Sequence, residues 1–221
     1  MSFLRSPAAA FVLLPTASAC WAGNHVVARA IAGEVPPASL CLVRWILLMG
    51  VIWLVARNTL AEDWPKLIAG AKPLVFLGLT GAAGFGTLQF VALHYTTALN
   101  MGVVGSVSPA FIVIASYVLF RDRMGPVQLT GVGISLIGVL AIVTRLHPEA
   151  LGQLAFNKGD LIILANMLLW AIYTACLRMR PAVSNLSFMF AIAAVAAMAN
   201  LPIAVWEHAH GHVLRPTGMT V

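Results

Sequence analysis

The chain has 221 residues, of which 61% are hydrophobic and only 9% carry a charge. Soluble domains average about 25% charged residues, so the composition excludes a globular protein with an ordinary water-exposed surface. The net charge of +6 comes from basic residues dispersed over short connections, which form no stripe along which phosphates would bind, and we expect no nucleic-acid partner.

The longest uncharged run lies between Pro73 and Phe120, where no Asp, Glu, Lys or Arg occurs. This run exceeds twice the ~20 residues that cross the hydrocarbon core of a bilayer as a helix, so it must contain two spans. A helix satisfies its own backbone hydrogen bonds, which lipid cannot do. The sequence therefore predicts an all-α, polytopic transmembrane bundle surrounded by membrane lipid.

Charge-free windows predict seven spans, each with about the 17 to 25 residues that a bilayer requires. The predicted spans are 8–28, 38–56, 73–93, 98–120, 126–144, 161–177 and 186–205. Short connections hold the turn-forming and charged residues, so neighbouring spans should run antiparallel.

Basic residues fall unequally on the two sets of connections. One set holds Arg5, Arg57, Lys66, Lys72, Arg121, Arg123, Arg178 and Arg180, and the other holds Arg29, Arg145, Lys158 and Arg215. Because basic loops stay on the cytoplasmic side, we expect a cytoplasmic amino terminus and an outer carboxyl-terminal tail. The expected location is the plasma membrane, which is the inner membrane in a bacterium.

An alternative for the amino terminus is a secretory signal peptide. Arg5, the apolar stretch after it and Ala17-Ser18-Ala19 resemble the three regions of such a signal. Hydrophobicity continues to Ala28, beyond the usual 7 to 15 apolar residues, so we expect an uncleaved first span.

The first predicted span presents an aromatic and polar stripe. Trp21, Asn24 and His25 are spaced i, i+3 and i+4, which places them on one helical face. Such a face lines a polar cavity, or it belongs to an aromatic belt or a helix contact. Both interpretations stay open, and the three residues are candidates for substrate binding.

Two further polar residues lie inside predicted spans. Arg44 lies about seven residues into the second span, where a charged side chain costs about 2.5 to 3.5 kcal/mol. A substrate carboxylate would explain it, but so would snorkelling or a hydrogen bond to neighbouring carbonyls. Gln89 in the third span is either a cavity residue or a polar helix contact.

The fourth predicted span contains Ser106-Val107-Ser108-Pro109. Proline removes a backbone donor and bends the helix, which frees a carbonyl for a serine, a neighbouring helix or a ligand. Broken helices near the midplane often bind solutes in transporters, although a bend also serves packing alone. Ser106, Ser108 and Pro109 are therefore candidate cavity residues.

An internal repeat appears when the sequence is shifted by about 149 residues. Trp21-Ala22 then falls on Trp170-Ala171, and Arg29 falls on Arg178. Five spans separate the two copies, so the second enters the membrane with the opposite orientation, as in alternating-access carriers. Trp170 and Tyr173, which share a helical face, become cavity candidates for the second copy.

The repeat divides the chain into two predicted units. Residues 1–147 hold a first repeat of five helices, and residues 148–221 hold a partial second repeat of two helices with an outer tail. Seven spans are thus expected of ten. A natural truncation and a partial sequence both explain the shortfall.

Several motifs together resemble the EamA-type permeases of the drug/metabolite transporter superfamily. The motifs are Trp21-Ala22-Gly23-Asn24, Val35-Pro36-Pro37 with Leu40 and Arg44-Trp45, Ala92-Leu93-His94-Tyr95-Thr96-Thr97-Ala98, Ser106-Val107-Ser108-Pro109 and Asp122-Arg123-Met124. The resemblance covers about Leu13 to Val205, and it depends on the order and spacing of motifs that are individually weak.

This resemblance implies ten helices in two inverted five-helix repeats around a central cavity that moves small metabolites such as amino acids. The chain departs from the family at Ala22, Gly23 and His25, where Trp-Gly-Ser-Asn-Phe is common, and at Arg121-Asp122-Arg123 in place of Gly-Glu-Arg. These departures bear on the substrate more than on the fold.

The expected function is alternating-access transport, possible efflux included, of a small-molecule substrate that is amino-acid-like or otherwise small and polar. The alternative is a truncated, non-transporting membrane protein or assembly partner that acts through helix packing. We expect no enzyme, because no Asp or Glu lies within a predicted span and no nucleophile has an evident base. Homo-oligomers are compatible with the sequence.

Histidines can bind metals or carry protons. His208, His210 and His212 alternate near the carboxyl end, but no cysteine or carboxylate pair completes a metal shell, so we expect no metal and no cofactor. His25 or His94 would have to serve any proton coupling, and facilitated flux is the other option.

Overall fold

The computed structural model describes residues 7–143 and 158–211, and within them the regular elements are helices. The elements are α1 (Pro7–Ala30), α2 (Pro37–Ala69), α3 (Ala71–Leu77), the π-helical segment η2 (Gly78–Gly84), α4 (Phe85–Tyr95), α5 (Ala98–Gly105), α6 (Ser108–Phe120), α7 (Pro126–Val143), α8 (Lys158–Cys176), the 3-10 turn η4 (Leu177–Met179) and α9 (Asn185–Ala209). The predicted all-α class is confirmed.

Length and composition qualify five described helices as membrane spans, and a bent pair makes a sixth. The five are Phe11–Ala30, Pro37–Ala69, Ala71–Tyr95, Lys158–Met179 and Asn185–Ala209, and the pair is α5 with α6, which meet at 42°. These six coincide with six predicted spans. The seventh, 126–144, coincides with α7, but its qualifying stretch is shorter, so it stays a prediction, and Thr144 lies outside the described residues.

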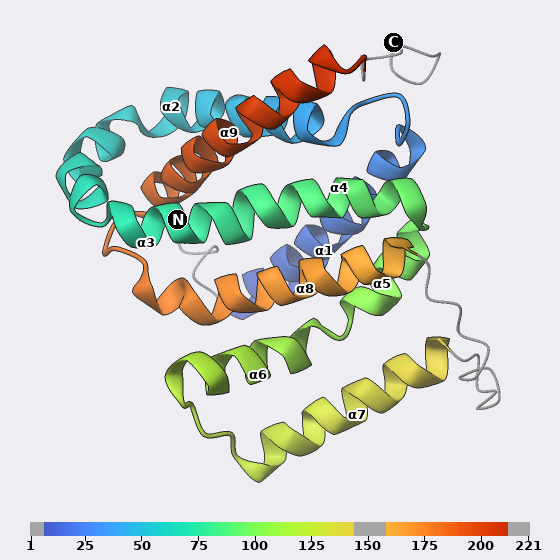
Figure 1. The fold of residues 1–221 in the computed structure, drawn as a ribbon. Coiled ribbons are helices and arrows are strands. Elements are labelled where there is room, and N and C mark those ends of the chain that lie inside the picture. Colours follow the sequence, from blue (N-terminus) through green and yellow to red (C-terminus); the bar gives the residue numbers. More distant parts are fainter. Residues whose placement is uncertain (1–6, 144–157, 212–221) are drawn as a thin grey trace.

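The helices are arranged with α2 and α9 crossing at one side of the molecule and α6 and α7 at the other (Figure 1). The continuous helix made of α3, η2 and α4 lies between them, next to α8, and α1 packs against α4 and α5. Residues distant in sequence are thus brought together: α8 contacts α4, α5 and α6.

Helix ends follow the local sequence. Pro36 precedes α2 with extended backbone angles, and Pro37 takes the first helical position, where its missing N–H costs nothing. The Thr97 side chain accepts a hydrogen bond from the Asn100 N–H at the start of α5, at 3.1 Å. Arg121 ends α6 in the left-handed conformation, with φ of 58°.

Glycines of η2 allow α8 and α9 to approach closely. A Cβ built on Gly81 would lie 2.1 Å from Cδ2 of Tyr173, and one on Gly78 would lie 2.6 Å from Cβ of Val195. No side chain larger than hydrogen fits at either point without movement. Because lipid provides no hydrophobic driving force for helix association, membrane helices depend on close van der Waals packing, and small residues at such contacts permit it.

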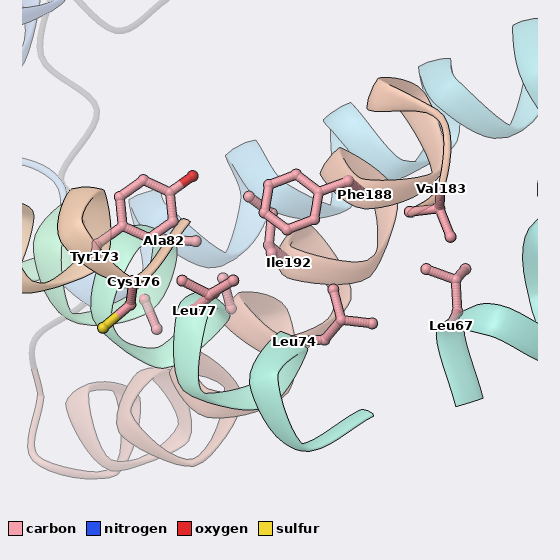
Figure 2. Packing of buried hydrophobic residues seen from close by; sticks show 11 residues of the cluster. Leu67, Leu74, Leu77, Ala82, Tyr173, Cys176, Val183, Phe188 and Ile192 are labelled. Carbon is pink, nitrogen blue, oxygen red and sulfur yellow. The ribbon is translucent and has the colours of Figure 1, made fainter. Parts of the chain in front are cut away.

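The largest buried apolar cluster lies next to this contact (Figure 2). Leu74 and Leu77 of α3 face Phe188 and Ile192 of α9, and Tyr173 of α8 closes the cluster at one end. The cluster fixes α8 and α9 against η2, and the rest of α8 is thereby placed along α4.

Two acidic residues join α2 and α9 reciprocally. The Glu207 carboxylate, near the end of α9, accepts hydrogen bonds from the N–H groups of Ala38 and Ser39 at the start of α2, both at 2.9 Å. Asp63, in the last third of α2, accepts one from the Ser184 N–H that caps α9, also at 2.9 Å. Each helix therefore supplies a buried acid to the positive end of the other.

Candidate functional site

A cavity of about 280 Å³ lies between α1, α4, the α5–α6 bend and α8. Six of the sequence-predicted candidates line it: Trp21, His25, Gln89, Ser106, Ser108 and Trp170. They come from four spans that the sequence separates widely. Its volume is near the lower end of the range for small-molecule sites.

Aromatic rings form one wall of the cavity. The ring centroids of Trp21 and Trp170 are 5.6 Å apart, with an interplanar angle of 63°. Phe85 lies 6.3 Å from Trp21 and 4.7 Å from Trp170. Edge-to-face and offset pairs of this kind hold each other in place, which gives the cavity a rigid apolar face.

The polar side chains are placed around this face. Gln89, which is buried, interacts with the imidazole of His25, and the Nε2 atom of His25 is buried without a hydrogen-bond partner in the described chain. Ser106 Oγ donates to the Val103 carbonyl at 2.5 Å, so the bend keeps its serine at the cavity edge. No Asp, Glu, Lys or Arg is among the residues lining the cavity in the described chain.

Four candidates do not line this cavity. Tyr173 is buried one turn from Trp170, with ring centroids 5.3 Å apart, and it belongs to the cluster at η2. Arg44 is exposed, and its guanidinium carbon lies 5.0 Å from the centroid of the Phe90 ring. Asn24 is half-buried on α1, and Pro109 lines a separate hollow between α6 and α7.

Sequence reasoning did not single out the apolar residues of the lining. Phe85, Met101 and Met167 complete the cavity, together with Gly102 and Gly105. Phe85 lies four residues before Gln89, and Met167 three before Trp170, so helical periodicity from the polar candidates would have found both.

A second hollow of about 410 Å³ lies where α1, α4 and α9 end, at Gly33, Pro36, His94 and Trp206. His94 Nε2 accepts the Gly33 N–H at 3.1 Å, and its Nδ1 is 2.9 Å from the Phe90 carbonyl. Arg29 donates to the Leu93 carbonyl beside it.

The other end of the bundle carries an ion pair. Asp122, in the α6–α7 connection, accepts hydrogen bonds from both terminal nitrogens of Arg178, one of them at 3.3 Å. The guanidinium carbon of Arg178 also lies 4.2 Å from the centroid of the Phe120 ring. The hydrogen bond from Arg178 holds the pKa of the Asp122 carboxyl below its usual value.

His208 lies in the last turn of α9, and His210 directly follows the helix. His208 and His210 are exposed, and His212 lies outside the described residues. Within the described ranges no group of three or more His, Cys, Asp or Glu side chains is arranged to hold a metal.

The predicted boundary between the two repeats, at residue 147, lies outside the residues that the structure describes.

The apolar helices, which are long enough to cross a bilayer, define an integral membrane protein, and its helices border a partly open cavity whose described lining has no Asp, Glu, Lys or Arg. The chain belongs to the EamA-like transporter family, whose sequence model matches residues 8–144. The predicted resemblance is confirmed.

Named relatives agree with this membership. The chain is 27% identical over 196 residues to "Uncharacterized transporter YyaM" of Bacillus subtilis, which covers 81% of this chain and 64% of that protein. It is 29% identical over 174 residues to an "Uncharacterized transporter" of Archaeoglobus fulgidus, covering 74% of this chain and 55% of the relative. The chain thus spans less than two thirds of the length of these relatives. No solved structure matches it significantly.

Proposed function

We propose that the chain transports a small polar metabolite by alternating access, with the cavity between α1, α4, α5, α6 and α8 as the substrate site. One observation carries the proposal: Trp21 and Trp170, equivalent in the predicted inverted repeat, meet at one cavity with His25, Gln89, Ser106 and Ser108. Carriers of this architecture bind their solute near the midplane at the repeat interface.

The reciprocal acid caps support the inverted repeat that the proposal requires. Asp63 binds the start of α9, and Glu207 binds the start of α2. These contacts lie at opposite ends of one antiparallel pair, as a two-fold axis in the membrane plane would place them. The proposal includes a cytoplasmic amino terminus in the plasma membrane, and His25 or His94 as the titratable groups available for coupling.

We propose no enzymatic role for the chain. Catalysis by general acids and bases needs paired titratable groups around a reacting atom, and His25 is the one ionisable side chain among the described residues that line the cavity. A neutral, aromatic and amide-lined site suits binding and release.

Flux into proteoliposomes tests the proposal. The 221-residue chain and a ten-span version are reconstituted in parallel and assayed with labelled amino acids and other small metabolites. Saturable uptake by the 221-residue chain, lost in a Trp21→Ala/Trp170→Ala variant, is the expected result. Uptake by the ten-span version alone would favour the alternative, in which this chain acts through helix packing.

A further inference from the structure

Asn166, on α8, is completely enclosed, and neither polar atom of its side chain has a partner. Its exposed fraction is 0%, and Oδ1 and Nδ2 both lack a hydrogen bond within the described chain. Asn200, on α9, is as deeply buried, but its amide accepts from the Thr87 hydroxyl and donates to the Ala196 carbonyl at 2.9 Å. The structure thus contains one satisfied and one unsatisfied buried asparagine.

An unsatisfied amide at this depth is unfavourable because lipid and apolar side chains offer no substitute for water. Buried polar groups without partners are rare in folded proteins and call for an explanation. The Asn166 side chain has no exposed surface, so a protein segment that approaches from outside the bundle does not reach it. A small molecule would reach it only when the helices around it move apart.

The position of Asn166 links it to the cavity. Met167, the next residue, lines the cavity, and so does Trp170, one turn further along the same face. At 1.5 Å per residue, Asn166 lies about 6 Å along the helix from Trp170, and both flank the middle of the span Lys158–Met179. Thr174, another turn on, also has a buried hydroxyl without a partner.

Two parts of the cavity wall that lie beside α8 can move. Met167 is a flexible side chain whose Sδ lies 3.7 Å from a Cβ built on Gly105. The bend between α5 and α6, where Gly105 lies, also borders the cavity. A displacement of this bent pair from α8 would widen the cavity along α8, the helix that carries Asn166.

The residues that line the cavity limit the chemical class of the ligand. The described lining has no carboxylate, ammonium or guanidinium group, so a charged solute would be buried without a counter-charge. The rings of Trp21, Phe85 and Trp170 offer an apolar face. A side-chain amide presents one acceptor beside two donors, which pairs with a donor and an acceptor on one edge of a planar molecule.

We propose that Asn166 is a substrate-binding residue that pairs with the amide-like edge of an uncharged, planar solute held against the tryptophans. This inference rests on the proposed transport function and specifies its substrate class. The Asn166 amide pairs with the substrate in a conformation in which the α5–α6 bend has moved away from α8. In the conformation described here, the amide is enclosed.

Nicotinamide and nicotinate test the inference directly, because they differ only in an amide in place of a carboxylate. Binding of each to the detergent-purified 221-residue chain is measured by calorimetry, with melting temperature recorded in parallel. The expected result is saturable binding of nicotinamide and none of nicotinate. Equal binding of both, or binding of neither, overturns the inference.

Asn166→Leu and Asn200→Leu form the matched pair of variants. Asn166→Leu is expected to weaken nicotinamide binding by at least about tenfold, while the melting temperature of the unliganded protein stays equal or rises, because no hydrogen bond is lost. Asn200→Leu is expected to lower the melting temperature. If leucine does not fit, Asn166→Ala repeats the binding measurement, and unchanged affinity in a folded Asn166 variant refutes the assignment.

Failure of this inference is distinguishable from failure of the transport function. If proteoliposomes take up an amino acid in a Trp21- and Trp170-dependent manner but the protein does not bind nicotinamide, the carrier function stands and the substrate class proposed here is wrong. If no solute is transported but nicotinamide still binds through Asn166, the binding site is confirmed and the proposed transport by this chain is wrong.

Discussion

Trp21 and Trp170 pack edge to face with their ring centroids 5.6 Å apart, although one lies in α1 and the other in α8. The two residues occupy equivalent positions when the sequence is shifted by 149 residues (170 − 21 = 149). A two-fold axis brings equivalent residues into contact only near the axis itself. The pair therefore supports placing the axis of the predicted inverted repeat at the cavity wall.

Removal of the indole rings of Trp21 and Trp170 should abolish transport without preventing the protein from folding. A Trp21→Ala/Trp170→Ala variant loses aromatic contacts of about 0.5 to 1.5 kcal/mol per pair, in addition to the apolar area they cover. We expect a folded protein with a lower melting temperature and uptake reduced to background. Full uptake by this variant would show that the rings serve packing alone.

Substitution of Gly81 should disturb the contact with α8. In Gly81→Ala the new methyl would lie 2.1 Å from Cδ2 of Tyr173, so the ring must shift, which costs about 1 to 3 kcal/mol. Gly50→Ala, on α2, is the control, because a Cβ there meets nothing within 4 Å. Thermal unfolding should show a clear loss for the first variant and no loss for the second. Equal melting temperatures would contradict the close packing of η2 on α8.

The contact of Glu207 with α2 should be a major determinant of stability. Glu207→Ala leaves the N–H groups of Ala38 and Ser39 without their acceptor, one of them fully buried, at a cost of about 2 to 3 kcal/mol. Glu207→Gln keeps one acceptor oxygen and should lose less. Glu62→Ala, an exposed acid on α2, should stay within about 0.5 kcal/mol of the parent protein. Unfolding in a denaturing detergent measures all three.

The Asp122–Arg178 pair predicts a pH dependence of defined sign. The pKa of Asp122 is lowered by its hydrogen bond with Arg178, so the folded state favours the ionised carboxyl. The stabilisation is present above the ordinary pKa of 3.8 and disappears as the pH falls through the lower folded value. The parent protein should therefore exceed Asp122→Asn in melting temperature at pH 7, and the difference should vanish below about pH 3.

Salt provides the control for this prediction. Both side chains are nearly half exposed, so the difference at pH 7 should be small and should shrink in 1 M NaCl, where charges are screened within about 3 Å. A difference that grows as the pH falls would contradict the assigned pairing.

The spans were predictable because their signal is additive over many residues. Hydropathy and charge placed 8–28 within α1 and 186–205 within α9, each within a few residues of the observed ends. The predicted second span ends at Ala56, where the backbone of α2 has a non-helical kink, and helical structure resumes beyond the kink and continues to Ala69. The segment of α2 after the kink contains charged residues, so hydropathy does not predict it as part of a span. It nevertheless contains a buried acid, Asp63.

The cavity was predictable in part. Polar and aromatic residues of the predicted spans mark helical faces that differ from the apolar faces expected to contact lipid. Four of these residues, from three helices, meet at the cavity: Trp21, His25, Gln89 and Trp170. Asn166 gave no such signal, because a single asparagine in an apolar helix looks the same whether its amide is satisfied or not. Arg44 gave a strong signal, yet its guanidinium lies over Phe90, since a long side chain extends away from its helix position.

We propose that α1, α4, α5, α6 and α8 together border one water-accessible site for a solute. Thiol accessibility tests it, in a background in which Cys20, Cys41 and Cys176 are replaced. Ser106→Cys, at the cavity edge, should react with a charged, membrane-impermeant maleimide, whereas Leu54→Cys, whose parent side chain is 80% exposed on the apolar face of α2, should react only with a lipid-soluble one. Modification of Ser106→Cys by the lipid-soluble reagent alone would contradict the cavity and leave only membrane residence.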